Sequence, residues 1–210
     1  MIATLVGSRE ISEVVGKRCT RIGYMLAELG IEMYSGKAGG ADLAFYQGYL
    51  LWHEHTKKPI RVKNFLPWKG FNDHVETKHD VLVDDEELSL QAAQLASKIH
   101  PAWFDLKRSH KLLHLRNMFQ VFGPDLRTEN SDFCLFAAPE IRNKVQGGTA
   151  TAVNTFRKFG LPNHNILESR KKFDYFMDDV LSEVECFIDL PDFEDIGGDV
   201  RFWENTYTKI

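Results

Sequence analysis

Two arginines, an aspartate and an asparagine stand where they could bind or process an anionic ligand. Arg9 follows the turn Gly7-Ser8, and its planar guanidinium could hold a phosphate, each charge-assisted bond being worth about 1.5–3 kcal/mol. Arg116 and Asn117 interrupt a strongly apolar stretch, where an arginine either extends to the surface or reaches an anion. Asp42 begins a helical stretch, where a carboxylate either stabilises the helix dipole or acts as an acid, base or sugar-hydroxyl acceptor. Asp42 is the candidate catalytic residue.

Three glycine-bearing turns would position these side chains. Each turn comes directly after an apolar run and before a helical pattern, which is where an open parallel sheet keeps its ligand crevice. Glycine lets backbone N–H groups approach a phosphate, and each following helix adds the positive end of its dipole. The predicted phosphate-binding residues of the turns are Gly7, Ser8, Arg9, Gly36, Gly39, Gly40, Gly147, Gly148 and Thr149. The Ser8 hydroxyl either caps the first helix or donates to the phosphate.

The second turn excludes two familiar nucleotide sites. It lacks the Lys-Ser/Thr ending of a P-loop, which disfavours ordinary ATP or GTP hydrolysis. It does not have the pattern G-x-G-x-x-G, and no acidic residue ends the second strand as a ribose ligand, so a standard NAD site is not expected. Lys37 in this turn is expected to be solvated. No cofactor is predicted.

Aromatic residues and histidines supply weaker signals. Trp68 and Phe71 follow the third predicted strand, where they either cover the sheet edge or flank the base of a ligand. Two histidine pairs lack the i,i+4 spacing of helical metal ligands, so no metal site is predicted. The pairs are His53 with His55 and His74 with His79.

The order of elements predicts an open parallel sheet with helices on both faces. Alternating strands and helices favour parallel pairing with right-handed crossovers. We therefore predict an α/β, Rossmann-like fold with a sheet of about five strands. The expected strands cover about 2–6, 31–35, 60–66, 132–138 and 165–167, with helices over about 11–29, 41–53, 109–122 and 148–159.

Two segments lie outside this pattern. Residues 68–101 form a polar insertion after the third strand, with a short helix over about 86–99. Residues 171–210 carry 4 Lys/Arg and 11 Asp/Glu, a net charge of -7 against -4 for the whole chain. The predicted organisation is a Rossmann-like domain over 1–168, whose insertion is a lid, and an acidic C-terminal extension over 169–210 that packs on it through an amphipathic helix.

Composition limits the partners and the compartment. A hydrophobic content of 43% supports a folded core, and a net charge of -4 argues against nucleic acid as a partner. Cys19, Cys134 and Cys186 are far apart and form no CxxC pair, which favours a reducing cytoplasmic compartment. No window approaches the roughly 20 apolar residues that cross a bilayer, and no signal peptide is apparent, so no membrane partner is expected.

These residues resemble the SLOG superfamily, the Rossmann-like group that contains the Lonely Guy phosphoribohydrolases and the DNA-processing protein DprA. The resemblance covers about residues 1–168 and implies a nucleotide-derived ligand and a homo-oligomer. It rests on Gly7-Ser8-Arg9, residues 35–42, Arg116, Ser131-Asp132-Phe133 and residues 147–151.

A second likeness is to proteins of tailed bacteriophages. It implies that the ligand is a signalling nucleotide of host defence, and that the protein acts in the host cytoplasm. It rests on residues 68–72, 100–103 and 113–117.

The third turn departs from the Lonely Guy signature G-G-x-G-T-x-x-E. Gly147, Gly148 and Thr151 match it, Ala150 replaces the third glycine, and Asn154 stands in the place of the glutamate. Thr151 and Asn154 are therefore predicted to contact the ligand. Asparagine can hydrogen-bond a ribose hydroxyl but cannot exchange a proton near neutral pH, and general acid–base catalysis is usually worth about 10²–10⁴-fold. The signature favours binding over hydrolysis.

Three functions follow from these observations. The leading hypothesis is a protein that binds a nucleotide or nucleotide-derived small molecule in a crevice at the carboxyl ends of the strands. The alternative is an N-glycosidase that releases the base of a nucleoside monophosphate through Asp42. The second alternative is a DprA-like binder of single-stranded nucleic acid, for which basic residues cluster at 57–63 and 107–116.

Overall fold

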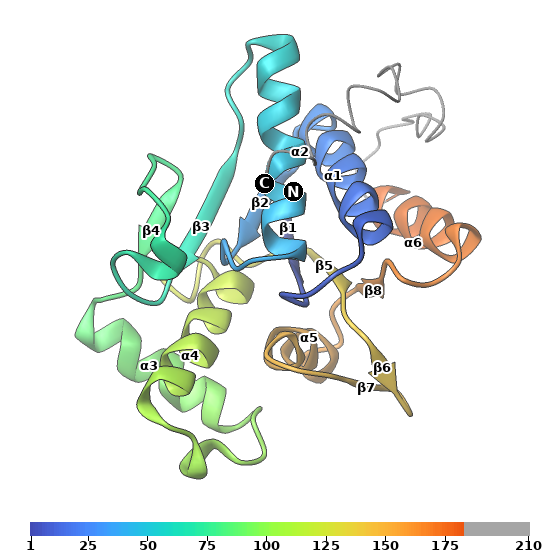
Figure 1. Ribbon diagram of the computed structural model, residues 1–210. Helices are drawn as coiled ribbons and strands as arrows, with labels where there is room; N and C mark the ends of the chain where they lie inside the picture. Colours follow the sequence, from blue (N-terminus) through green and yellow to red (C-terminus); the bar gives the residue numbers. More distant parts are fainter. Residues whose placement is uncertain (183–210) are drawn as a thin grey trace.

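The fold is organised around a parallel sheet of six strands in the order β4-β3-β2-β1-β5-β8 (Figure 1). A computed structural model describes residues 1–182 of the 210-residue chain. This sheet and its surrounding helices confirm the predicted α/β Rossmann-like fold. The strands are β1 Ile2–Gly7, β2 Glu32–Ser35, β3 Val62–Leu66, β4 Asp80–Leu82, β5 Phe133–Ala137 and β8 Asn163–Asn165.

The central strands form because their side chains are buried on both faces of the sheet, as in other parallel sheets. Leu5 of β1 pairs with Leu135 of β5, and Ala3 of β1 pairs with Met33 of β2. The one polar side chain in β1, Thr4, is fully buried and donates to the backbone oxygen of Gln120 at 2.6 Å. This bond ties the middle of the sheet to the end of the helix that lines the site.

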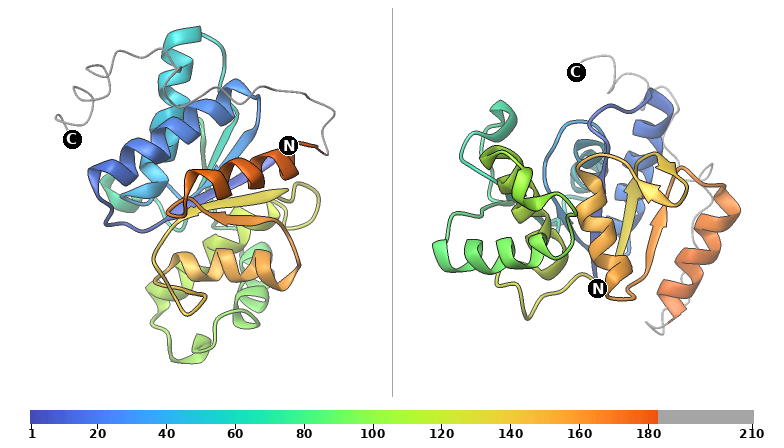
Figure 2. Two further views of the ribbon diagram at one scale, coloured as in Figure 1. Left: turned by 90° about the vertical axis from the view of Figure 1, so that its right-hand side faces the viewer. Right: turned by 90° about the horizontal axis from the view of Figure 1, so that it is seen from below.

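Helices cover both faces of the sheet (Figure 2). Helices α1, α2 and α6 pack on one face of the sheet and form a single apolar core with it. Helices α4 and α5 cover the other face, and α3 packs against α4. The helix bounds are α1 Glu13–Glu28, α2 Ala41–Thr56, α3 Glu86–Ser97, α4 Arg108–Phe122, α5 Thr149–Lys158 and α6 Arg170–Ser182. Ser12 caps α1 by accepting a hydrogen bond from the Val15 N–H. The predicted alternative of Ser8 as this cap is therefore wrong.

Two strand features are absent from the prediction. Residues 68–101 contribute the edge strand β4, in which Val81 pairs with Phe65, as well as α3. A two-stranded hairpin, β6 Glu140–Ile141 with β7 Lys144–Val145, leads from β5 to the third glycine turn. These strands have two or three residues each, which is too short for an alternating pattern to emerge from the sequence.

The first part of the acidic extension, Arg170–Ser182, forms α6. This helix buries Phe173, Met177, Val180 and Leu181 in the core that α1 and α2 also share. Cys186 and the rest of the acidic segment lie outside the described residues, so the proposed boundary near residue 169 stays a prediction. Among the helices that the structure describes, none is long and apolar enough to cross a membrane.

Candidate functional site

A cavity of about 770 Å³ opens at the carboxyl ends of β1 and β5. The chain moves outward from β1 in one direction through β2 to β4 and in the other through β5 to β8, so these strands flank the topological switch point of the sheet. Ligands of open α/β sheets bind at this position, and the volume is that of a small-molecule site. The cavity is lined by the turn after β1, by Ala38 after β2, by the segment between β5 and α5, and by one face of α4.

A buried ion pair lies at the inner end of the cavity. Asp42 and Arg116 are 3% and 5% exposed, and Arg116 Nη1 lies 3.7 Å from Asp42 Oδ2. Asp42 Oδ1 accepts the Gly7 N–H at 3.0 Å, and Oδ2 accepts the Ala38 N–H at 3.4 Å. Burial raises the pKa of Asp42, and Arg116 and the backbone donors oppose that rise. The carboxylate therefore takes the place that an anionic ligand would occupy between the first two turns.

The guanidinium of Arg116 is only partly satisfied. Gln120, with its amide oxygen turned toward the donors, accepts from Arg116 Nη1 and from the Gly36 N–H, both at 2.8 Å. Arg116 Nε is buried and hydrogen-bonds to none of the described residues. Arg116 as a residue also lines the cavity.

The glycines of the first two turns serve close packing within the fold. A Cβ on Gly7 would lie 2.5 Å from Ala41 Cβ, and one on Gly40 would lie 2.3 Å from the Arg9 oxygen. A Cβ on Gly36 would lie 0.9 Å from Arg116 Nη1. These contacts account for glycine at all three positions without a ligand. Phosphate binding by these residues stays a prediction.

The third turn, in contrast, is open. Gly147 has a φ of +76°, and a Cβ on either Gly147 or Gly148 would meet no atom within 4 Å. Gly148 is the N-cap of α5 and supplies no side chain to the free N–H groups of the first turn of the helix. Asn117 donates from Nδ2 to the Gly148 oxygen at 3.0 Å, which fixes the turn against α4. Gly147, Gly148 and Thr149 all line the cavity.

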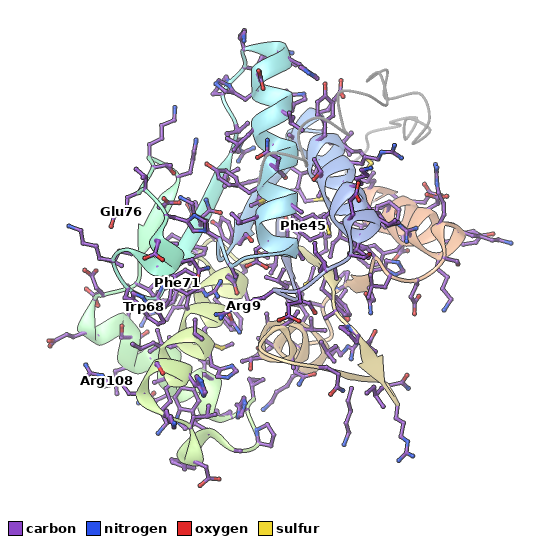
Figure 3. All side chains as sticks on the ribbon, in the orientation of Figure 1. Arg9, Phe45, Trp68, Phe71, Glu76 and Arg108 are labelled. Carbon is purple, nitrogen blue, oxygen red and sulfur yellow. The ribbon has the colours of Figure 1, made fainter. Side chains whose placement is uncertain are left out.

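Arg9 also lines the cavity, and its side chain is exposed. Its guanidinium carbon lies 5.9 Å from the centre of the Phe71 ring, and that of Arg116 lies 5.8 Å from the same ring. Arg9, Phe71 and Trp68 are labelled in Figure 3. Phe71 is 2% exposed and meets Trp68 edge-to-face. Neither aromatic residue is part of the cavity lining, and base stacking by these two residues stays a prediction.

Several predicted contacts lie away from the cavity. Asn154 is exposed and does not line it, because α5 turns about 100° per residue and Thr149 and Ala152 face the cavity. Thr151 is buried and hydrogen-bonds His114 Nδ1 at 2.7 Å. Position 154 corresponds by spacing to the catalytic glutamate of the family signature, but it does not lie at the cavity.

Lys37 is not solvated, contrary to the prediction. Its side chain is 6% exposed and its ammonium lies 2.6 Å from Asp80 Oδ2. Burial alone would raise the pKa of Asp80, but the hydrogen bonds from Lys37 and the Thr77 N–H lower it. Lys37 therefore connects the second turn to the edge strand β4. This contact depends on β4, which the sequence analysis did not predict.

Three histidines at the outer end of the cavity were missed. His100, His110 and His114 all line it, and the rings of His100 and His114 are 4.4 Å apart between centroids. Burial, together with the neighbouring His100, His110 and Arg116, lowers the pKa of His114 to about 4. The i,i+4 spacing of His110 and His114 was the available signal. Within residues 1–182 no group of three or more His, Cys, Asp or Glu side chains could hold a metal ion.

Fold and cavity together define an α/β Rossmann-like protein whose site lies at the carboxyl ends of its strands. No protein-family model matches the chain, and no curated protein matches its sequence. A solved structure similar to it is DNA processing protein A from Helicobacter pylori, described for its single-stranded DNA binding mode. The two are 12% identical, with a TM-score of 0.45, over 99% of this chain and 80% of that chain. Membership of the SLOG superfamily stays a prediction.

The similar protein is described for its single-stranded DNA binding mode, whereas nucleic acid was not expected as a partner of this chain. We withdraw that expectation. The net charge on which it rested is a sum over the whole chain, and residues 171–210 alone contribute -7 to the total of -4. The remaining residues are net positive, so the sum conceals how charge is distributed near the cavity.

Proposed function

We propose that this protein binds a nucleotide or nucleotide-derived small molecule in the cavity, with a phosphate between Arg9 and the N-terminus of α5. The observation that carries this proposal is the presence, in one cavity, of two unused sources of positive potential. They are the exposed Arg9 and the uncapped first turn of α5 at Gly148. Each favours an anion, and a helix N-terminus without a side-chain cap offers backbone donors directly.

The first test removes the exposed charge. Arg9→Ala should weaken the binding of nucleoside 5′-monophosphates by about 10- to 100-fold, the equivalent of one charge-assisted bond. Isothermal titration with a panel of mono-, di- and cyclic nucleotides measures this change. Arg127→Ala is the matched control, because Arg127 is exposed but lies outside the cavity lining. Equal affinities for the two variants would overturn the assignment of Arg9.

The second test blocks the turn sterically. Gly148 has a φ of -64° and open space around its missing Cβ, so Gly148→Leu fits the backbone without strain. The leucine side chain would cover the N-terminus of α5, and binding should be lost while the thermal midpoint stays near that of the wild type. Gly39→Leu is the control, because Gly39 is equally open but does not line the cavity. Full binding by the Gly148 variant would place the phosphate elsewhere.

The N-glycosidase alternative has a direct assay. Asp42 would have to act as the acid or base, yet both of its oxygens are engaged by backbone donors and Arg116. We therefore expect retention of the nucleotide without release of the base. Chromatography of the protein incubated with nucleoside monophosphates measures the amount of free base. Release of base by the wild type at a rate proportional to protein concentration would refute a purely binding role.

A second candidate function is the binding of single-stranded nucleic acid. The observation that favours it is a set of exposed basic and aromatic side chains beside the outer end of the cavity. Lys107 and Arg108 are exposed at the start of α4, Phe104 is 85% exposed, and His110 in the first turn of α4 lines the cavity. Cations beside an exposed ring are the groups that hold the backbone and bases of a single strand.

Salt dependence tests this candidate. Each phosphate contact contributes a slope of about -0.7 to a plot of log affinity against log salt. Lys107→Ala/Arg108→Ala should therefore reduce the slope for a single-stranded oligonucleotide by about 1.4, measured by fluorescence anisotropy. Lys57→Ala/Lys58→Ala tests the other basic cluster for comparison, because these exposed lysines follow α2 and lie outside the cavity lining. No binding at low salt would eliminate the candidate.

The likeness to bacteriophage proteins suggests which ligands to test first. We propose that a signalling nucleotide of host defence is the ligand, that the protein acts in the host cytoplasm, and that it forms a homo-oligomer. Cyclic and linear dinucleotides therefore belong in the binding panel. Mass spectrometry of small molecules released from the natively purified protein identifies the ligand, and light scattering of the same sample gives the oligomeric state.

A further inference from the structure

One face of α4 carries a row of polar side chains along the length of the cavity. His110, His114, Asn117 and Gln120 recur every three or four residues and all line the cavity. This spacing places them on one face of the helix. At 1.5 Å per residue, the row extends roughly 15 Å from the outer to the inner end. That length exceeds what one phosphate group can contact.

The two ends of the row have different chemistry. At the inner end, Gln120 accepts a hydrogen bond from Arg116, and Arg116 pairs with the Asp42 carboxylate. At the outer end, three histidines converge from two elements, His110 and His114 from α4 and His100 from the loop after α3. The N–H of Ala102 donates to His100 Nδ1 at 3.2 Å, so the neutral His100 ring carries its proton on Nε2.

No carboxylate neutralises the histidines. Their neighbours are Thr151, which hydrogen-bonds His114 from α5, Arg116 on α4, and each other. In the part of the chain that the structure describes, no salt bridge joins them to an acidic side chain. Glu10, in the turn after β1, is the remaining carboxylate of the cavity besides Asp42, and it is exposed.

The formal charges of the cavity lining also leave the histidines without a counter-charge. Two arginines, Arg9 and Arg116, are balanced by two carboxylates, Glu10 and Asp42, so the cavity has no formal charge while its histidines are neutral. A neutral imidazole becomes a cation when it binds a proton. An anion at the outer end would supply the counter-charge that the imidazoles lack and would favour their protonated form.

We propose that His100, His110 and His114 form a second anion subsite, so that the cavity holds a ligand with two phosphoryl groups on one nucleoside. The first phosphate lies between Arg9 and the α5 turn, and the second lies among the histidines. This inference rests on the proposed nucleotide-binding function and defines its ligand class more narrowly. Uptake of such a ligand is accompanied by uptake of protons from solvent.

Calorimetry with two related ligands tests the subsite. Adenosine 3′,5′-bisphosphate should bind the wild type at least tenfold more tightly than AMP at pH 6, and this preference should shrink at pH 8. His100→Ala/His110→Ala should remove the preference and leave AMP affinity unchanged, while His53→Ala, on the exposed end of α2, should preserve it. Titration in buffers of different ionisation enthalpy should report proton uptake for the bisphosphate and much less for AMP.

The outcomes separate the subsite from the function on which it rests. AMP binding without a bisphosphate preference, or a preference that survives in the double variant, overturns the subsite and leaves nucleotide binding intact. Failure of both ligands and of dinucleotides to bind overturns the proposed function itself. The two phosphoryl groups can belong to a free nucleotide or to consecutive nucleotides of a strand. If a 5′-phosphorylated dinucleotide binds as tightly as a ten-residue strand, the ligand is a free nucleotide. If affinity increases steadily with the length of the oligonucleotide, the ligand is a nucleic-acid strand.

Discussion

Replacing Asp42 with asparagine should destabilise the protein by about 3–5 kcal/mol, the cost of leaving one member of a buried ion pair without its partner. Asp42 is 3% exposed, its carboxylate lies 3.7 Å from Arg116 Nη1, and its oxygens accept two backbone N–H groups at 3.0 and 3.4 Å. Asparagine preserves the shape and one acceptor, but it turns an NH₂ group toward a donor and leaves the guanidinium uncompensated. Such a loss is a large part of a typical stability of about 5–15 kcal/mol.

Urea unfolding followed by circular dichroism measures this cost. Asp42→Asn/Arg116→Met removes both charges, so the double variant should be more stable than the sum of the single effects predicts, by about 2 kcal/mol. A single Asp42→Asn variant within 1 kcal/mol of the wild type, or strictly additive effects, would refute the paired-charge interpretation. Unchanged stability with complete loss of base release would instead restore Asp42 as a catalytic group.

Three further predictions concern stability. Gly36→Ala should cost about 3 kcal/mol in urea unfolding, because its Cβ would lie 0.9 Å from Arg116 Nη1 and displace that side chain. The pKa of His114 falls from 6.5 to about 4 in the folded state, so stability should decrease as pH is lowered from about 6.5 to 4, by up to roughly 3 kcal/mol. Unfolding curves across this range should be less pH-dependent in His114→Gln; an unchanged dependence would contradict the assignment. Lys37→Met should cost about 3 kcal/mol because it leaves the Asp80 carboxylate buried and unpaired, and Lys37→Met/Asp80→Leu should recover part of that loss in thermal melts.

The sheet was predictable where its strands are continuous apolar runs. The strands over 2–7 and 133–137 carry five or six consecutive residues that fit a buried parallel strand, and their helices have clear apolar periodicity. Strand β4 has three residues, Asp80–Leu82, and an edge position that tolerates polar neighbours. Its existence depends on pairing with β3 and on the Lys37–Asp80 contact, neither of which is local in sequence.

The location of the site was predictable from the sequence. The acceptors to which its backbone N–H groups donate were not. Glycine turns after strands mark the carboxyl edge of a parallel sheet, which is where the cavity lies. Which groups accept the amide protons depends on tertiary contacts such as Gly7 with Asp42, 35 residues apart. The same limit applies to Asn154, whose sequence match to a family signature says nothing about which face of α5 it occupies.

Backbone N–H groups of the first two turns are already bonded within the protein, and this changes how the cavity would attract an anion. Asp42 satisfies their amide groups and offsets Arg116, which leaves Arg9, the α5 turn and the histidines as the adjustable sources of positive potential. A groove of permanent cations binds anions with a strong dependence on salt and little dependence on pH. A cavity that gains its charge by protonating imidazoles should in addition depend strongly on pH, because the charge appears only when ligand and proton bind together. Measurement of affinity against both variables therefore distinguishes binding inside the cavity from binding along the basic residues at the start of α4.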